Sequence, residues 1–216
     1  MRVAIIGGSF NPVHNGHLAL ADAVVKEFGY DKILFIPAFC SPDKKIYSGV
    51  SAKDRLTMLE LAIKNNPSFE IETCELERKG ISYTIDTINY LYKKYNANIH
   101  TNNMQKQVSA DVLNGKIGLV IGDDLEKGFC NWKNAKLLAQ KTDIIVAHRI
   151  MQSNSFDSTV VEFEKKELSN AILPISSSGI RLAIQQKKAW RYFVPSDVYN
   201  YIEAKDLYGK KNETSN

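Results

Sequence analysis

Residues 3–17 read VAIIGGSFNPVHNGH, a short apolar run followed by a turn with two glycines and then by two histidines. The run from Val3 to Ile6 is rich in β-branched residues, which favours a buried strand. A helical pattern begins just after the histidines. Glycine lets the backbone approach a phosphate closely, and a helix start supplies unpaired N–H groups and the positive end of the helix dipole. The stretch therefore predicts a strand, loop and helix that together bind an anion.

The same alternation of strand and helix continues along the chain. Apolar runs predict strands at residues 3–6, 33–36, 69–74, 117–121 and 144–147. Helix-period stretches lie at residues 18–28, 52–64, 85–95 and 134–140. This order predicts an α/β fold with a doubly wound, mainly parallel sheet, in which ligands bind beyond the carboxyl ends of the strands. We therefore expect the chemistry in the loops after Ile6, Ile36 and Ile121.

The domain organisation predicted from composition is simple. Residues 1–203 form one domain with a small helical C-terminal part. Residues 96–115 are polar and rich in asparagine, and residues 152–168 are polar with several charges, so both are predicted to be surface insertions. The tail, residues 204–216, has little apolar content and is expected to be frayed.

Composition disfavours several classes of protein. The hydrophobic fraction of 44% is typical of a globular protein with a packed core. The formal net charge is +4 and charges of both signs are interspersed, so no nucleic-acid-binding stripe is indicated. The three cysteines contain no CxxC pair, which disfavours a disulfide framework and a zinc site. No run reaches membrane-spanning length and no signal-peptide pattern follows Met1, so we expect a soluble, cytoplasmic protein without nucleic-acid or membrane partners.

Two sets of polar residues are candidates for binding phosphate. His14 and His17 are three positions apart, so both imidazoles can lie on one side of the helix start and donate N–H bonds to phosphate oxygens. Residues 175–181, ISSSGIR, place three hydroxyls at a second helix start and Arg181 one turn later. Each set has a plainer interpretation: a glycine turn with solvated histidines, and an ordinary helix cap.

Taken together, these motifs resemble the nucleotidyltransferase superfamily. Residues 8–17 carry every fixed position of its GxFxPxHxGH signature, and residues 175–181 resemble its ISSTxIR box, with Ser178 where threonine is usual. The first motif matches neither the Walker pattern nor GxGxxG, which disfavours a P-loop hydrolase and a dinucleotide-binding dehydrogenase. The resemblance implies a Rossmann-like nucleotidyltransferase fold. It also implies an ATP site made by Gly7, Gly8, Ser9, Phe10, His14, Gly16, His17, Ser176, Ser177, Ser178 and Arg181.

Further segments resemble one branch of the superfamily, the nicotinate-nucleotide adenylyltransferases of bacteria. Residues 82–87, SYTIDT, match the segment that receives the pyridine mononucleotide, which implies substrate-binding roles for Tyr83 and Thr84. A simple helix cap is the alternative for Thr84. Residues 121–124, IGDD, are similar to a family motif that implies Gly122 and Asp124 in ATP binding. The same resemblance implies that Trp132 stacks on the pyridine base, with a core aromatic as the alternative.

Two basic residues extend this resemblance. Residues 36–45, IPAFCSPDKK, are similar to a proline-rich family loop that ends in a lysine reaching phosphate. That lysine is Lys44 or its neighbour Lys45, because Asp43 stands where the family commonly has histidine. A solvated surface lysine is the alternative. Arg149 follows the strand at 144–147 and corresponds to a family arginine near adenine.

The resemblance implies an enzyme of NAD biosynthesis that transfers AMP from ATP to nicotinate mononucleotide, giving deamido-NAD and pyrophosphate. His14, His17, Lys44 and Arg181 are the implied catalytic residues, and Mg²⁺ is expected on the ATP phosphates without a protein ligand. The acceptor phosphate is already ionised at neutral pH, so no general base is required. Sequence alone decides neither the acid nor the amide form of the acceptor, and it leaves a homo-oligomer open.

Other functions are compatible with parts of this pattern. The acceptor in the reaction can be nicotinamide mononucleotide or another phosphorylated small molecule, as in pantetheine-phosphate and glycerol-phosphate transferases. Those chains are usually shorter and lack SYTxDT. A fragment of a class I aminoacyl-tRNA synthetase is disfavoured because no KMSKS-like loop is present. A non-catalytic nucleotide-binding module would bind ATP without releasing pyrophosphate.

Overall fold

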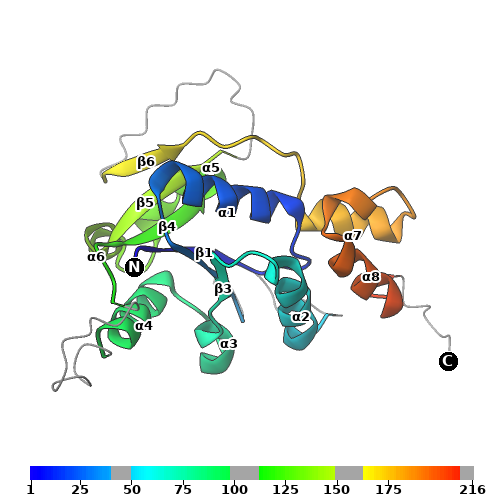
Figure 1. Cartoon of the computed structure of the whole chain (residues 1–216), viewed down its shortest axis with the longest axis horizontal. Helices are drawn as coiled ribbons and strands as arrows, with labels where there is room; N and C mark the ends of the chain where they lie inside the picture. Colours follow the sequence, from blue (N-terminus) through cyan, green and yellow to red (C-terminus); the bar gives the residue numbers. More distant parts are fainter. Residues whose placement is uncertain (40–49, 98–111, 149–162, 210–216) are drawn as a thin grey trace.

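The computed structural model describes residues 1–39, 50–97, 112–148 and 163–209, and its centre is a parallel six-stranded sheet (Figure 1). The strands are β1 (Val3–Gly8), β2 (Lys32–Pro37), β3 (Phe69–Ile71), β4 (Ile117–Gly122), β5 (Thr142–Ala147) and β6 (Lys165–Leu168). They lie in the order β3-β2-β1-β4-β5-β6, and every ladder is parallel. The predicted doubly wound α/β fold is confirmed. The order reverses between β1 and β4, where such sheets open a crevice for ligands.

Helices cover both faces of this sheet. They are α1 (Asn15–Phe28), α2 (Ala52–Ile63), α3 (Cys74–Arg78), α4 (Thr84–Ala97), α5 (Asp123–Glu126), α6 (Ala135–Lys141), α7 (Ser177–Gln185) and α8 (Ser196–Ala204), with short 3₁₀ turns at Phe129–Asn131 and Arg191–Phe193. In Figure 1, α1 lies on the upper side of the sheet and α4 on the lower side. No helix among the described residues is both long and apolar enough to cross a membrane.

Two separate cores follow from the alternation of side chains along each strand. In β1, Ala4 and Ile6 pack in the core that contains α1, α2, α7 and α8. Val3 and Ile5 point to the other face and pack in the core that contains α4 and α6. Strands that are buried on both faces have near-continuous apolar sequences, which is why the sequence pattern revealed them.

One predicted strand is shorter than expected. Residues 69–74 were expected to form a strand, but β3 ends at Ile71 and Cys74 begins α3. The buried Glu72 side chain accepts a hydrogen bond of 3.0 Å from the Cys74 N–H, which turns the chain out of the sheet. Side chains that bond the nearby backbone in this way compete with strand ladders.

The segment predicted as a surface insertion, residues 152–168, ends in a strand of the sheet. β6 pairs in parallel with β5, and Leu168 is fully buried opposite Ala147. The charges that suggested an insertion are those of an edge strand: Lys166 pairs with Asp143 at 2.8 Å. Polar residues on an edge strand protect it from pairing with other chains. Because they interrupt the apolar pattern, the sequence analysis did not predict this strand.

The tail predicted to fray from residue 204 instead continues as a folded turn through the last described residue. After α8, the Leu207 N–H donates to the Ile202 carbonyl at 3.0 Å and the Asp206 N–H donates to the Glu203 carbonyl at 3.2 Å. Asp206 has a left-handed φ of 47°. These bonds form a Schellman motif, which ends the helix and reverses the chain. Leu207 and Tyr208 are thereby returned to the core, where they pack.

Candidate active site

A cavity of about 980 Å³ lies at the carboxyl ends of the central strands. Gly7 of β1, Ile36 of β2, Ile121 of β4 and Ala147 of β5 all line it. Its volume is at the upper end of the range typical of small-molecule sites. Gly8, Ala38 and Asp124, which follow Ile6, Ile36 and Ile121 in the sequence, also line it, so the cavity lies at the strand ends where the sequence predicted the chemistry.

The two histidines of the first motif lie stacked at the start of α1. Their ring centroids are 3.7 Å apart, and the His14 backbone N–H donates to Nδ1 of His17 over 3.2 Å. Because Nδ1 accepts this bond, the neutral His17 ring carries its proton on Nε2. Both rings line the cavity, and Phe10 packs against His17 in a T-shaped arrangement with 5.1 Å between ring centroids. His17 is therefore oriented to donate a hydrogen bond from Nε2.

Gly16 lies close against the ring of His14 in this stack. A Cβ placed at residue 16 would lie 3.0 Å from Nδ1 of His14, which is closer than side chains normally pack. A side chain at residue 16 would therefore require the ring of His14 to shift by a few tenths of an ångström. The short distance to His14 is thus a steric reason for glycine at this position of the motif, which the sequence pattern alone does not reveal.

The second motif contacts the first directly. The Ser177 hydroxyl donates to the Pro12 carbonyl at 2.8 Å, and Nη1 of Arg181 donates to the Asn11 carbonyl at 2.6 Å. Figure 1 shows the starts of α1 and α7 side by side, although 165 positions separate Pro12 from Ser177 in the sequence. Ser177 and Arg181 line the same cavity as the histidines. Two helix starts therefore face one space, which favours a polyanionic ligand.

Ser176 has the plainer role of a helix cap. Its side chain accepts a bond of 3.1 Å from the Gly179 N–H and so satisfies one of the unpaired donors at the start of α7. Nη2 of Arg181 donates to the Ser178 hydroxyl at 3.2 Å, which holds the arginine against its own helix. Within the ISSSGIR stretch, capping and contact with the first loop are thus divided between Ser176 and its neighbours.

The SYTIDT stretch forms another part of the cavity wall at the start of α4. Tyr83, Thr84 and Trp132 line it together with Lys133. The Lys133 ammonium lies 4.3 Å from the centroid of the Tyr83 ring and 3.1 Å from Oδ2 of Asp86. Trp132 also packs on Phe129, with 5.3 Å between ring centroids, so it is both a core aromatic and a wall residue. Aromatic faces and a cation meet here, next to a helix start.

Glu75 is a buried carboxyl in the same wall that the sequence analysis missed. The Thr87 hydroxyl donates to its Oε1 at 2.7 Å, and Nη2 of Arg78 donates to that hydroxyl at 3.1 Å. Burial raises the pKa of Glu75, and the Thr87 hydrogen bond and the Arg78 charge oppose this effect only in part. Its place just beyond β3 could have identified it, since the carboxyl ends of all the central strands face the site.

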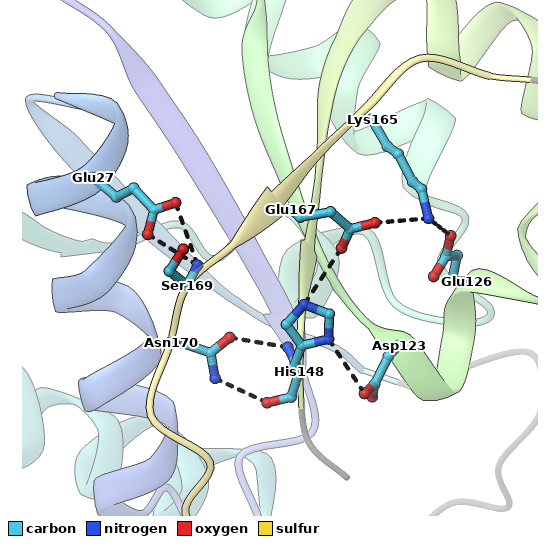
Figure 2. Close-up of polar contacts among 8 residues, drawn as sticks. All are labelled: Glu27, Asp123, Glu126, His148, Lys165, Glu167, Ser169 and Asn170. Atoms are coloured by element: carbon cyan, nitrogen blue, oxygen red, sulfur yellow. Dashed lines mark hydrogen bonds and ion pairs between the residues drawn. The ribbon is translucent and has the colours of Figure 1, made fainter. Parts of the chain in front are cut away.

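His148 is a second missed wall residue, and Figure 2 shows its surroundings. The Asn170 side chain binds both backbone groups of His148: its Oδ1 accepts from the N–H at 2.9 Å, and its Nδ2 donates to the carbonyl at 2.8 Å. The imidazole lies between two carboxylates, with Nδ1 3.8 Å from Asp123 and Nε2 3.5 Å from Glu167. His148 directly follows β5, which is the signal that could have revealed it.

Comparison with known proteins identifies the family. Residues 5–183 match the cytidylyltransferase-like family. The chain is 40% identical to a protein of Treponema pallidum named probable nicotinate-nucleotide adenylyltransferase, over 96% of this chain and 99% of that one. A protein of Borreliella afzelii with the same name is 41% identical over 98% of each chain. This chain belongs to the nicotinate-nucleotide adenylyltransferase family.

A solved structure agrees with this adenylyltransferase fold. The nicotinic acid mononucleotide adenylyltransferase of Plasmodium falciparum, in complex with APC, has a TM-score of 0.70 at 16% identity and covers 96% of each chain. The same protein in complex with NaAD has a TM-score of 0.68 at 18% identity, over 96% of this chain and 97% of that one. At these identities the likeness concerns the fold.

Within this member of the adenylyltransferase family, the structure gathers most of the predicted site residues. Of those in the described part of the chain, all except Phe10 and Gly122 line the cavity. Phe10 is buried beneath His17, and Gly122 is buried as the last residue of β4. Lys44 and Arg149 lie outside the described residues.

Proposed function

We propose that this protein transfers AMP from ATP to nicotinate mononucleotide, giving deamido-NAD and pyrophosphate. The observation that carries the proposal is the shared cavity: the histidine pair, the start of α7 with Arg181 and the Tyr83 region all line it. One triphosphate and one mononucleotide need an extended, cation-lined space of this kind. The named relatives support the same reaction.

The proposed reaction is an in-line displacement between two anions. An oxygen of the acceptor phosphate attacks the α-phosphorus of ATP, and the bond from that phosphorus to the bridging oxygen breaks, releasing pyrophosphate. No proton has to be removed from the nucleophile. The work of the protein is to align the anions and to neutralise the charge that develops on the leaving group.

Specific side chains supply these two effects in the proposal. His17 donates from Nε2, and the start of α7 with Arg181 faces the same phosphates from the other side. His14 holds His17 through the backbone bond and the ring stack. Lys44, which follows β2 in the sequence, is proposed to add a cation. No side chain acts as a covalent nucleophile.

Mg²⁺ would be bound by the ATP phosphates, where it would supply positive charge that lowers the repulsion between the reacting anions. The donors that line the phosphate end are imidazole, hydroxyl and guanidinium groups, which suit phosphate oxygens better than a magnesium ion. Within the described residues, no group of three or more His, Cys, Asp and Glu side chains could hold a metal ion. A cation carried by the nucleotide fits this donor set.

We propose that the residues around Tyr83 select the acceptor. Thr84 begins α4, so the positive end of the helix dipole favours a carboxylate here, and Lys133 adds a positive charge beside the ring of Tyr83. These features favour the acid form. The amide form is the second candidate, because a backbone N–H also binds an amide oxygen.

Pyrophosphate release from ATP, measured separately with nicotinate mononucleotide and nicotinamide mononucleotide, tests the proposal. We expect fast release with the acid and slower release with the amide. A preference for the amide would refute the acceptor assignment. ATP binding without release with either compound would refute the adenylyltransferase activity itself and indicate a nucleotide-binding module.

A further inference from the structure

The turn that follows α8 reaches the loop of the first motif. Tyr208 Oη donates a hydrogen bond of 2.6 Å to Oδ1 of Asn11, a residue 197 positions earlier in the chain. Asn11 lies between Phe10 and Pro12 of the motif and is 2% exposed. A residue near the C-terminus therefore bonds a buried side chain of the loop that precedes the two histidines.

The hydroxyl of Tyr208 is held firmly in this place. The Schellman motif around Asp206 reverses the chain after α8 and points residues 207 and 208 back to the core. Oη also lies 4.0 Å from Sδ of Met58 in α2, and burial raises the pKa of Tyr208 far above its ordinary value. The left-handed φ of 70° at Tyr208 is unusual for a large side chain, so the packing around it must hold the backbone there.

Asn11 connects this hydroxyl to the phosphate end of the cavity. While its side chain accepts from Tyr208, its carbonyl accepts from Nη1 of Arg181 at 2.6 Å. The next carbonyl, that of Pro12, accepts from Ser177. A rotation of the Asn11 residue would therefore move the acceptor that orients Arg181, and it would disturb the junction between the two motifs.

We propose that Tyr208 is a positioning residue for ATP: its hydroxyl holds Asn11, and the Asn11 carbonyl in turn orients the Arg181 guanidinium toward the phosphates. This inference rests on the proposed function, because it takes ATP as the ligand of the cavity. It makes the C-terminal turn part of the nucleotide site although Tyr208 does not touch the ligand. It also assigns a role to Asn11, a position that the signature leaves variable.

Tyr208→Phe tests the role because it removes one oxygen and keeps the ring that packs in the core. We expect the dissociation constant for ATP, measured by calorimetric titration, to rise roughly tenfold, because a buried hydrogen bond is lost and Asn11 keeps an unsatisfied acceptor. The KM for ATP should rise by a similar factor, while the KM for the acceptor should change by less than about twofold. A purely structural residue would not separate the two substrates in this way.

Tyr201→Phe is the matched control. Tyr201 lies in α8, and its Oη donates to Oδ1 of Asp54 in α2 at 2.8 Å, so it also joins the C-terminal region to the core but does not contact the motif loop. We expect Tyr201→Phe to lower the Tm by about as much as Tyr208→Phe does. We expect it to leave the ATP affinity within about twofold of that of the unaltered protein. Equal ATP affinity in Tyr208→Phe, Tyr201→Phe and the unaltered protein would overturn the proposal.

A double variant tests the route through Asn11. If Tyr208 acts on Arg181 by way of Asn11, then Tyr208→Phe should weaken ATP binding by less than about twofold in an Asn11→Ala background. Full, additive weakening would show that the hydroxyl acts by another route and would also overturn the proposal. The titration with ATP distinguishes a failure of the Tyr208 proposal from a failure of the proposed function. If the unaltered protein binds ATP but releases no pyrophosphate, the proposed reaction is refuted, while the effect of Tyr208 on ATP binding can still be measured.

Discussion

At the scale of single residues, the key side chains of the cavity also form hydrogen bonds within the protein that fix their positions. Nδ1 of His17 accepts from the His14 backbone N–H, so the neutral ring carries its proton on Nε2, the atom that we propose donates to phosphate. Arg181 divides its donors among the Asn11 carbonyl, the Ser178 hydroxyl and the cavity that it lines. The side chains that we propose for phosphate binding therefore also make structural hydrogen bonds.

Variants of His17 should separate its structural bond to the His14 backbone from its proposed donation to phosphate. His17 is the third residue of α1, where a glutamine can accept the same N–H bond at a helix start. We expect His17→Ala to lower kcat by roughly 10² to 10³, the cost of losing one preorganised donor to a developing charge, and His17→Gln, whose amide N–H can still donate, to lower it less.

The two variants should differ in stability, measured by thermal unfolding. His17→Gln should keep a Tm close to that of the unaltered protein because the helix start stays satisfied, and His17→Ala should lose several degrees. A folded His17→Ala protein with a near-normal rate would show that Nε2 does not contribute to turnover.

At the scale of elements, pattern analysis located the buried strands and their helices well, because period is a local property of the sequence. Strands covered on both faces read as apolar runs, and α1, α2 and α4 began within a few residues of their predicted starts. Pattern analysis failed where polar residues serve a structural role. The Glu72 turn ended β3 early, and the charged edge strand β6 resembled an insertion.

Ser176 offers a prediction at this scale, since it caps a whole helix. Ser176→Ala leaves the Gly179 N–H without its acceptor, and we expect the free energy of unfolding to fall by about 1 kcal/mol. Ser176→Gly is the control, because glycine at this position costs only a few tenths of a kcal/mol. Urea unfolding of the two variants gives both values, and equal stability of the two would argue against the capping role.

At the scale of the whole molecule, stability should depend on pH through Glu75. Its pKa is raised above the ordinary value of 4.5 in the folded state, so the folded protein binds more protons than the unfolded chain between those two pKa values. The associated stability is fully present below the ordinary value and is lost as the pH rises through the folded-state pKa. The direction follows from the burial of a carboxyl group, which disfavours its charged form.

Glu75→Gln tests this linkage because glutamine cannot ionise and can still accept from Thr87. We expect the Tm of Glu75→Gln to increase relative to that of the unaltered protein as the pH is raised from about 4 to about 8. The exposed residue Glu203, changed to Gln, is the control and should show no such gain. A constant difference between Glu75→Gln and the unaltered protein over this range would contradict the raised pKa.

By itself, the sequence determined the α/β class, the family and many of the residues that line the cavity, because motif spacing and hydrophobic period are carried by neighbouring residues. Only the tertiary structure decided which distant groups meet. The bonds from Arg181 and Tyr208 to Asn11 join segments far apart in the chain, and no local pattern encodes such contacts. Glu75 and His148 also became wall residues only when the strands were laid side by side, since their position depends on the order of the sheet.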